Sequence, residues 1–149
     1  MTAGKPTIFD LANAFLSIET MSHKKLQKLC YYAKAWHLAL YNEPIITEPF
    51  EAWVHGPVNR ELYGTYKQYG WDDIPKAESS EGIPSDVLSF AQQIYASYGA
   101  LDAYDLEVIS HKETPWIEAR GACKPWEGCS VIISEDTMRD YYRSKRANG

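Results

Sequence analysis

Helical spacing of apolar residues near the start of the chain is the feature that most constrains its fold. Apolar residues between positions 8 and 16 recur every three or four residues, and Thr7 with Asp10 supplies a capped, acidic helix start. Residues 23–41, preceded by the capping residue Ser22, carry a broader apolar face and predict a central helix. The stripe expected to be buried on this helix consists of Leu26, Leu29, Cys30, Ala33, His37 and Leu40.

Further helix starts follow along the chain. Capping residues and apolar spacing predict helices after Asn59, Ser85, Asp102 or Asp105, Thr114-Pro115 and Ser134. Residues 50–54 alternate and predict a short strand, whereas residues 71–84 and 121–129 are rich in turn formers. The expected fold is therefore mainly α: a compact single-domain bundle of about six helices with one or two short β-strands, spanning residues 1–149.

The charge and the cysteine count limit which ligands and which cellular compartment suit the chain. The chain has 20 acidic and 15 basic residues and a net charge of −5, which argues against nucleic acid as its main ligand and is also an ordinary charge for solubility. An odd count of three cysteines, with neither a secretory leader nor a membrane-spanning apolar run, predicts a cytoplasmic protein with free thiols. We expect no membrane partner.

The chain carries no recognisable set of metal ligands. Cys123 and Cys129 are separated by five residues, and His111 lies upstream, but zinc sites need closer cysteine pairs and a second pair to complete them. A glycine-rich phosphate loop, paired carboxylates and a G-x-S-x-G turn are also missing from the sequence. The sequence therefore predicts no metal, no cofactor and no enzymatic activity.

Two polar and aromatic clusters are candidate sites. In the first, His55, Gly56 and Pro57 form a predicted turn that leads into a helix starting near Arg60. This cluster has two open interpretations: an exposed rigid turn that anchors a ligand or partner, or a structural turn in which Gly56 supplies unusual backbone geometry and Arg60 pairs with a carboxylate. A catalytic role for His55 as a base lacks a nearby nucleophile in the sequence.

The second cluster comprises His111, Trp116 and Arg120 at the expected start of a late helix. Trp116 directly follows Pro115, where a tryptophan serves either to fill the core or as a platform for a ligand. Both interpretations remain open from the sequence.

Three segments together resemble a known family. KLQKLCYYAKAWHLAL, FEAWVHGPVNRELYGTYKQYG and ISHKETPWIEARG resemble, in the same order and spacing, the Panacea domain of SocA-like antitoxins. The resemblance runs from about Ile8 to Tyr142, and its most specific part is the AW-x-x-GPV motif at Ala52–Val58. Ser110 occupies the first position of a segment that is of Thr-His type in the family, whereas the GACKPWEGC loop is not a family hallmark.

The resemblance implies an antitoxin of a bacterial or phage toxin–antitoxin pair that neutralises a cognate toxin by direct contact. One branch of the family resembles a proteolytic adaptor that delivers its toxin to the ClpXP protease. Such a role requires a surface of roughly 800 Å² per partner with aromatic or arginine anchors, and no catalytic group. The candidate partner-binding residues are Trp53, His55, Gly56, Pro57, Arg60, Tyr63, Tyr66, His111, Trp116 and Arg120.

Two alternatives to the antitoxin interpretation remain. A small-ligand or nucleotide-handling enzyme would use His55, Arg60 and His111 as one site, and a pocket holding these groups or perturbed histidine pKa values would favour it. A flat apolar patch would favour a protein binder. A phage-encoded interaction protein with no toxin encoded beside it is a third possibility, and the sequence leaves the oligomeric state open.

Overall fold

The computed structural model describes residues 5–148 and folds mainly into α-helices within that range, which confirms the predicted fold class. The helices are α1 (Ile8–Ile18), α2 (His23–Tyr41), α3 (Arg60–Tyr66), α4 (Ser85–Tyr98), α5 (Ala103–His111), α6 (Thr114–Arg120) and α7 (Glu135–Asn148). The strands are β1 (Glu51–Trp53) and β2 (Gly56–Val58), and a short 3-10 helix, η1 (Lys67–Tyr69), continues α3. None of the described helices is long and apolar enough to cross a membrane.

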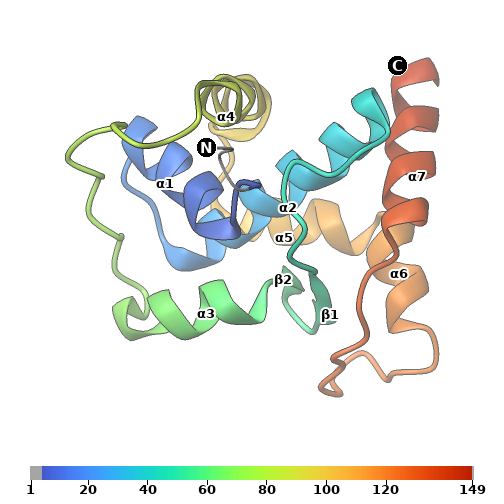
Figure 1. Ribbon diagram of the computed structural model, residues 1–149. Helices are drawn as coiled ribbons and strands as arrows, with labels where there is room; N and C mark the ends of the chain where they lie inside the picture. Colours follow the sequence, from blue (N-terminus) through green and yellow to red (C-terminus); the bar gives the residue numbers. More distant parts are fainter. Residues whose placement is uncertain (1–4, 149) are drawn as a thin grey trace.

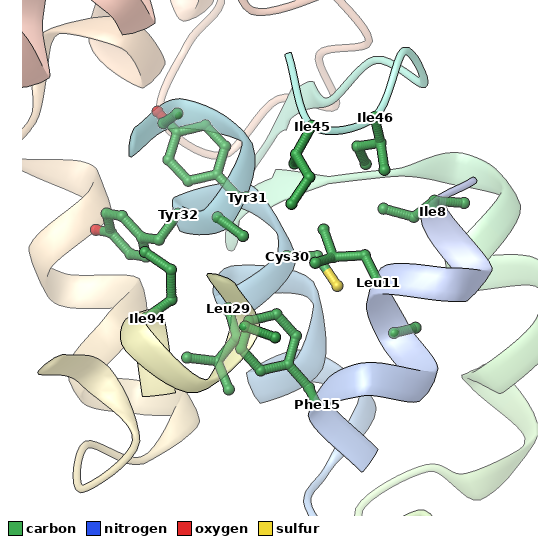
Figure 2. Close-up of a cluster of buried hydrophobic side chains, with 14 of the residues drawn as sticks. Ile8, Leu11, Phe15, Leu29, Cys30, Tyr31, Tyr32, Ile45, Ile46 and Ile94 are labelled. Atoms are coloured by element: carbon green, nitrogen blue, oxygen red, sulfur yellow. The ribbon is translucent and has the colours of Figure 1, made fainter. Parts of the chain in front are cut away.

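Helix α2 is the centre of the molecule, as expected from its broad apolar face. It runs through the middle of the fold, with α1 and α4 on one side and α7 on the other (Figure 1). It also contacts α3, α5 and β2. Figure 2 shows how Leu11 and Phe15 of α1 meet Leu29 and Cys30 of α2, with Ile94 approaching from α4. Because α2 touches most other elements, its side chains set where those elements sit.

The buried face of α2 differs from the expected stripe in its last two turns. The prediction is confirmed for the first four residues of the stripe and for Ala39, which was expected to broaden it, but His37 and Leu40 are half-exposed, and Leu38 is buried instead. The reason is that α7 lies along α2 and covers this side, where Arg143 donates a hydrogen bond of 3.1 Å to the Ala39 carbonyl.

Local capping explains where most helices begin. Thr7 and Asp10 form a capping box at α1, Ser22 caps α2, and Asp102 with Asp105 forms a second capping box at α5. Helix α4 is an exception, because Ser85 is its first helical residue and Pro84 occupies the cap position.

The segment around Gly56 is a hairpin strand rather than the predicted turn. The turn lies at Val54-His55, and Gly56–Val58 forms β2, which pairs antiparallel with β1 so that Trp53 lies opposite Gly56. Residues 131–133 hydrogen-bond to the other side of β1, which leaves β2 as an outer strand. Pro57 is tolerated there because a proline lacks only the donor that an outer strand does not need.

Candidate functional site: an aromatic and basic cleft

A cleft of about 810 Å³ opens where four segments meet: the start of α2, the β1–β2 hairpin, α3, and the segment 126–130. Figure 1 shows these segments in the lower half of the molecule. The cleft is lined by His23, Lys24, Gln27, Lys28, Trp53, Val54, His55, Val58, Arg60, Tyr63, Lys67, Gly70, Trp71, Trp126, Gly128, Cys129 and Ser130. Its volume is within the range of small-molecule sites and also suits an inserted peptide side chain.

The cleft brings together four of the ten candidate partner-binding residues, namely Trp53, His55, Arg60 and Tyr63. The other six do not line it. They are Gly56, Pro57, Tyr66, His111, Trp116 and Arg120.

Arg60 forms one wall of the cleft together with two aromatic rings. Its guanidinium donates to both carboxylate oxygens of Glu51, at 3.2 and 2.8 Å, and lies 5.5 Å from the centre of the Trp53 ring. The indole of Trp53 donates to the same carboxylate at 2.9 Å and meets Tyr63 edge-to-face at 4.9 Å. Partial burial by itself raises the pKa of Glu51, but the hydrogen bonds from Arg60 and Trp53 outweigh it and lower that pKa overall.

Arg60 is thus both paired and accessible. Its side chain remains 64% exposed while Glu51 is largely covered, so the ion pair fixes the position of the guanidinium and leaves much of it open to a partner. His55, on the hairpin turn, is similarly exposed and lies 3.4 Å from a carboxylate oxygen of Glu107 on α5.

Lys28 of α2 also lines the cleft. Its side chain is only 3% exposed, and Gly56 lies directly against it, since a Cβ atom at position 56 would stand 2.5 Å from the Lys28 Cε. Burial lowers the pKa of Lys28 to about 8, although the nearby Glu107 acts in the opposite direction. Within residues 5–148 the Lys28 ammonium forms no hydrogen bond or ion pair, and it is not one of the fully enclosed unpaired atoms, so it keeps contact with the cleft that it lines.

His23 is a second buried polar group at the cleft. It is 8% exposed, its Nδ1 has no hydrogen-bond partner within the described chain, and its ring meets Tyr63 edge-to-face at 6.0 Å. Burial lowers the pKa of His23, and the charges of Lys24 and Lys28 lower it further. At neutral pH the imidazole is therefore mainly uncharged, as suits a ring with an enclosed nitrogen that has no partner.

A buried polar pair holds α2, the hairpin and α3 in place around the cleft. The Gln27 amide donates to the Asn59 carbonyl at 3.0 Å and accepts from the Asn59 backbone N–H at 2.8 Å. Asn59 in turn caps α3 by accepting from the Leu62 N–H and donates to the Pro49 carbonyl. These bonds give the side-chain oxygen and nitrogen of both amides a partner, so α3 presents Arg60 and Tyr63 from a rigid base.

The second predicted cluster, His111, Trp116 and Arg120, packs against the hairpin and does not line the cleft. His111 stacks on Trp116 at 4.1 Å, and the Trp116 indole donates to the Trp53 carbonyl at 2.8 Å. Burial lowers the pKa of His111, whose Nε2 has no partner within the described chain. His111 does not join His55 and Arg60 in lining the cleft, so the three groups of the enzyme alternative do not share it.

Arg120 holds the segment that carries Trp126. It is 5% exposed and donates to the carbonyls of Ala52 (3.1 Å), Glu127 (2.9 Å) and Lys124. One guanidinium therefore connects the end of α6, the hairpin and the loop beside the cleft.

We expect Arg120→Ala to lower the free energy of unfolding by about 2 kcal/mol, because it leaves three carbonyls without a donor. Urea unfolding followed by circular dichroism measures this loss. Limited proteolysis should cut the loop 121–130 first in the variant, and an unchanged cleavage pattern would contradict the assigned role.

Thirteen of the cleft residues were not among the sequence candidates, and four of these bear most on the chemistry of the cleft: His23, Lys28, Trp71 and Trp126. A signal for Lys28 existed, because it stands between Leu26 and Leu29 on a helix that is apolar on most sides, so one of its lysines had to lie inside. Trp71 and Trp126 lie outside the helices, and no local pattern connects them to the cleft.

Within residues 5–148 the structure contains no group of three or more His, Cys, Asp or Glu side chains placed to hold a metal ion. The three cysteines are free thiols, and a hydrogen bond with Cys129 raises the pKa of Cys123.

Comparison with known proteins gives one match. The family described as "Antitoxin SocA-like, Panacea domain" matches residues 26–117, which include most of α2, the hairpin, α3 and the start of α6. The matched region contributes most of the residues that line the cleft, whereas Trp126 and its segment lie beyond it. No curated protein and no solved structure matches the chain significantly.

Proposed function

The chain belongs to the family of SocA-like antitoxins with a Panacea domain, and from this membership we propose that it neutralises a cognate toxin by direct protein contact. The single observation that carries the proposal is the aromatic and basic cleft, which stands in place of the flat apolar patch expected of a binder and does not include the His111 that the enzyme alternative requires. Tryptophan, tyrosine and arginine are the residues that contribute most to binding energy at protein interfaces, and all three gather here.

Exposure of the cleft's aromatic residues supports a protein partner. Trp71 is 86% exposed and Trp126 is 75% exposed, which are unusual values for the largest apolar side chain. Lys24 lies 4.5 Å from the Trp71 ring centre and holds it beside the cleft. A toxin that covers these rings would bury a large apolar area at little cost in side-chain entropy.

We assign the ten candidate residues two kinds of role. Four of them, Trp53, His55, Arg60 and Tyr63, contact the toxin directly because they line the cleft. The remaining six support the contact surface: Gly56, Pro57, Tyr66, His111, Trp116 and Arg120 pack against the core or hold the hairpin in place.

The experiment that tests this function starts from the reading frame beside the gene. Its product should arrest growth when expressed alone, and co-expression of this chain should restore growth and yield a complex that co-purifies. Growth arrest that co-expression of this chain does not relieve would contradict the proposal.

Toxin lifetime separates the two modes of neutralisation. If the chain blocks the toxin by contact, as we propose, the toxin persists in rescued cells and rescue survives deletion of ClpXP. If rescue disappears in the deletion strain and the toxin there becomes long-lived, the chain acts as a proteolytic adaptor instead.

For the contact surface, Arg60→Ala should weaken toxin binding about thirtyfold, measured by calorimetry. The melting temperature should stay within a few degrees, because Arg60 is an exposed side chain whose pairing with Glu51 is screened by solvent. A variant that melts much earlier would identify Arg60 as structural, and one that binds normally would place the contact elsewhere.

A further inference from the structure

Resting on the proposed function, we propose that the cleft receives an acidic segment of the toxin and that one carboxylate of this segment binds the buried Lys28 ammonium. This names the chemistry of the partner: an exposed Asp or Glu flanked by apolar residues that cover the tryptophans of the cleft.

Lys28 has a buried side chain and no charged partner within the described chain. A buried ammonium without a partner is costly, and buried charges in proteins are normally paired. The same helix shows the ordinary solution, because Lys34 is fully buried and its ammonium binds the Glu135 carboxylate at 2.8 Å and the Glu48 carbonyl at 2.7 Å. Lys28 has no such partner among the described residues and instead borders the cleft. An incoming anion would supply what the chain does not.

The lining of the cleft is rich in positive charge. Lys24, Lys28, Arg60 and Lys67 line it, and no Asp or Glu is found among its described lining residues. Counting also Glu51, which pairs with Arg60, and Glu107, which acts on Lys28, the four cations still outnumber the carboxylates at the cleft, on a chain whose net charge is −5. Such a cleft attracts anions and raises the rate at which a complementary partner associates.

The surroundings of the cleft favour a carboxylate on a protein over other anions. The acidic chain repels a long polyanion, whereas a short acidic segment brings only one or two charges. The exposed Trp71 and Trp126 beside the cleft suit apolar neighbours of that carboxylate, which a free phosphate lacks. His23 also lines the cleft, and its Nδ1 is an enclosed polar atom without a partner in the described chain.

The test compares Lys28→Met with Lys76→Met, a variant that loses the same charge from an exposed loop position outside this cleft. Calorimetry with the product of the adjacent reading frame should show binding weakened at least tenfold for Lys28→Met and unchanged for Lys76→Met. The melting temperature of Lys28→Met should not fall, whereas a purely structural lysine would lower it. Single Asp→Asn and Glu→Gln changes across the toxin should reveal one carboxylate whose loss has no further effect in the Lys28→Met background.

Several outcomes would overturn this inference. If wild type binds the toxin and Lys28→Met binds within twofold of it, the carboxylate contact is wrong while the antitoxin function stands. If wild type does not bind the adjacent product, the function itself fails. A probe titration of the isolated protein, read by tryptophan fluorescence, should show a short peptide with one glutamate flanked by apolar residues binding more tightly than inorganic phosphate. The reverse order would indicate a phosphate ligand, and a dimer that Lys28→Met dissociates would indicate a second copy of this chain.

Discussion

Gly56→Val is expected to lower the free energy of unfolding by about 3–5 kcal/mol, through backbone strain and overlap with a buried side chain. Gly56 has φ of +113°, a conformation that β-branched residues rarely adopt. A Cβ atom there would also stand 2.5 Å from Lys28 Cε and 3.1 Å from Ser110 Oγ. Urea denaturation monitored by tryptophan fluorescence measures the change, and toxin binding should fall with it because the Lys28 side chain must move.

Two glycine controls separate strain from overlap. Gly70 also has a positive φ, +58°, but a Cβ atom would meet nothing within 4 Å, so Gly70→Val should show the strain alone and cost about 1–3 kcal/mol. Gly64 lies within α3 with open space around it, and Gly64→Ala should stabilise the protein by roughly 0.5–1 kcal/mol. A Gly56→Val cost no larger than that of Gly70→Val would show that Lys28 moves aside freely.

Local sequence signals predicted the helices well because each helix start is decided by a few neighbouring residues. Thr7, Ser22, Asn59 and Asp102 are all observed caps, and each accepts a backbone hydrogen bond from a residue three positions later. The central position of α2 was predictable for a related reason, since a helix with apolar residues on most sides has to be surrounded.

The hairpin was harder to predict because its outcome depends on tertiary contacts. Gly56 and Pro57 locally predict a break in the strand, yet they form β2. Residues 131–133 pair with the other side of β1, so β2 is the outer strand and tolerates a proline. This pairing partner is more than seventy positions away in the sequence, so no window around Gly56 contains it.

The candidate site was predictable only in part, for the same reason. Trp53, His55, Arg60 and Tyr63 lie in one continuous segment, and their grouping follows from the strand, turn and helix that they occupy. The remaining cleft residues come from α2, β2, η1 and loops. Lys28 carried a signal for burial in its place between Leu26 and Leu29, but only the fold shows that it borders the cleft.

The two buried lysines of α2 should respond in opposite ways to the same substitution. Lys34→Met is expected to lower the free energy of unfolding by about 2–4 kcal/mol, because it removes a cation that binds Glu135 and the carbonyls of Thr47 and Glu48. Glu135 is 46% exposed and can be rehydrated, which keeps the loss below that of a fully enclosed pair. Lys28→Met should instead leave stability unchanged or raise it by up to about 3 kcal/mol, the free energy that corresponds to a pKa lowered from 10.5 to about 8.

The pH dependence of stability gives an independent measurement of this difference. Below pH 8 Lys28 is protonated in both the folded and the unfolded chain, so the folded state bears the full cost of the buried charge. Between pH 8 and 10.5 the folded protein releases this proton while the unfolded chain keeps it, so wild type should gain stability relative to Lys28→Met as the pH rises. Urea unfolding of both proteins at several pH values across this window should therefore show their stabilities converging. Parallel stability curves would mean that Lys28 is hydrated in the folded protein, and its ammonium would then need no carboxylate from a partner.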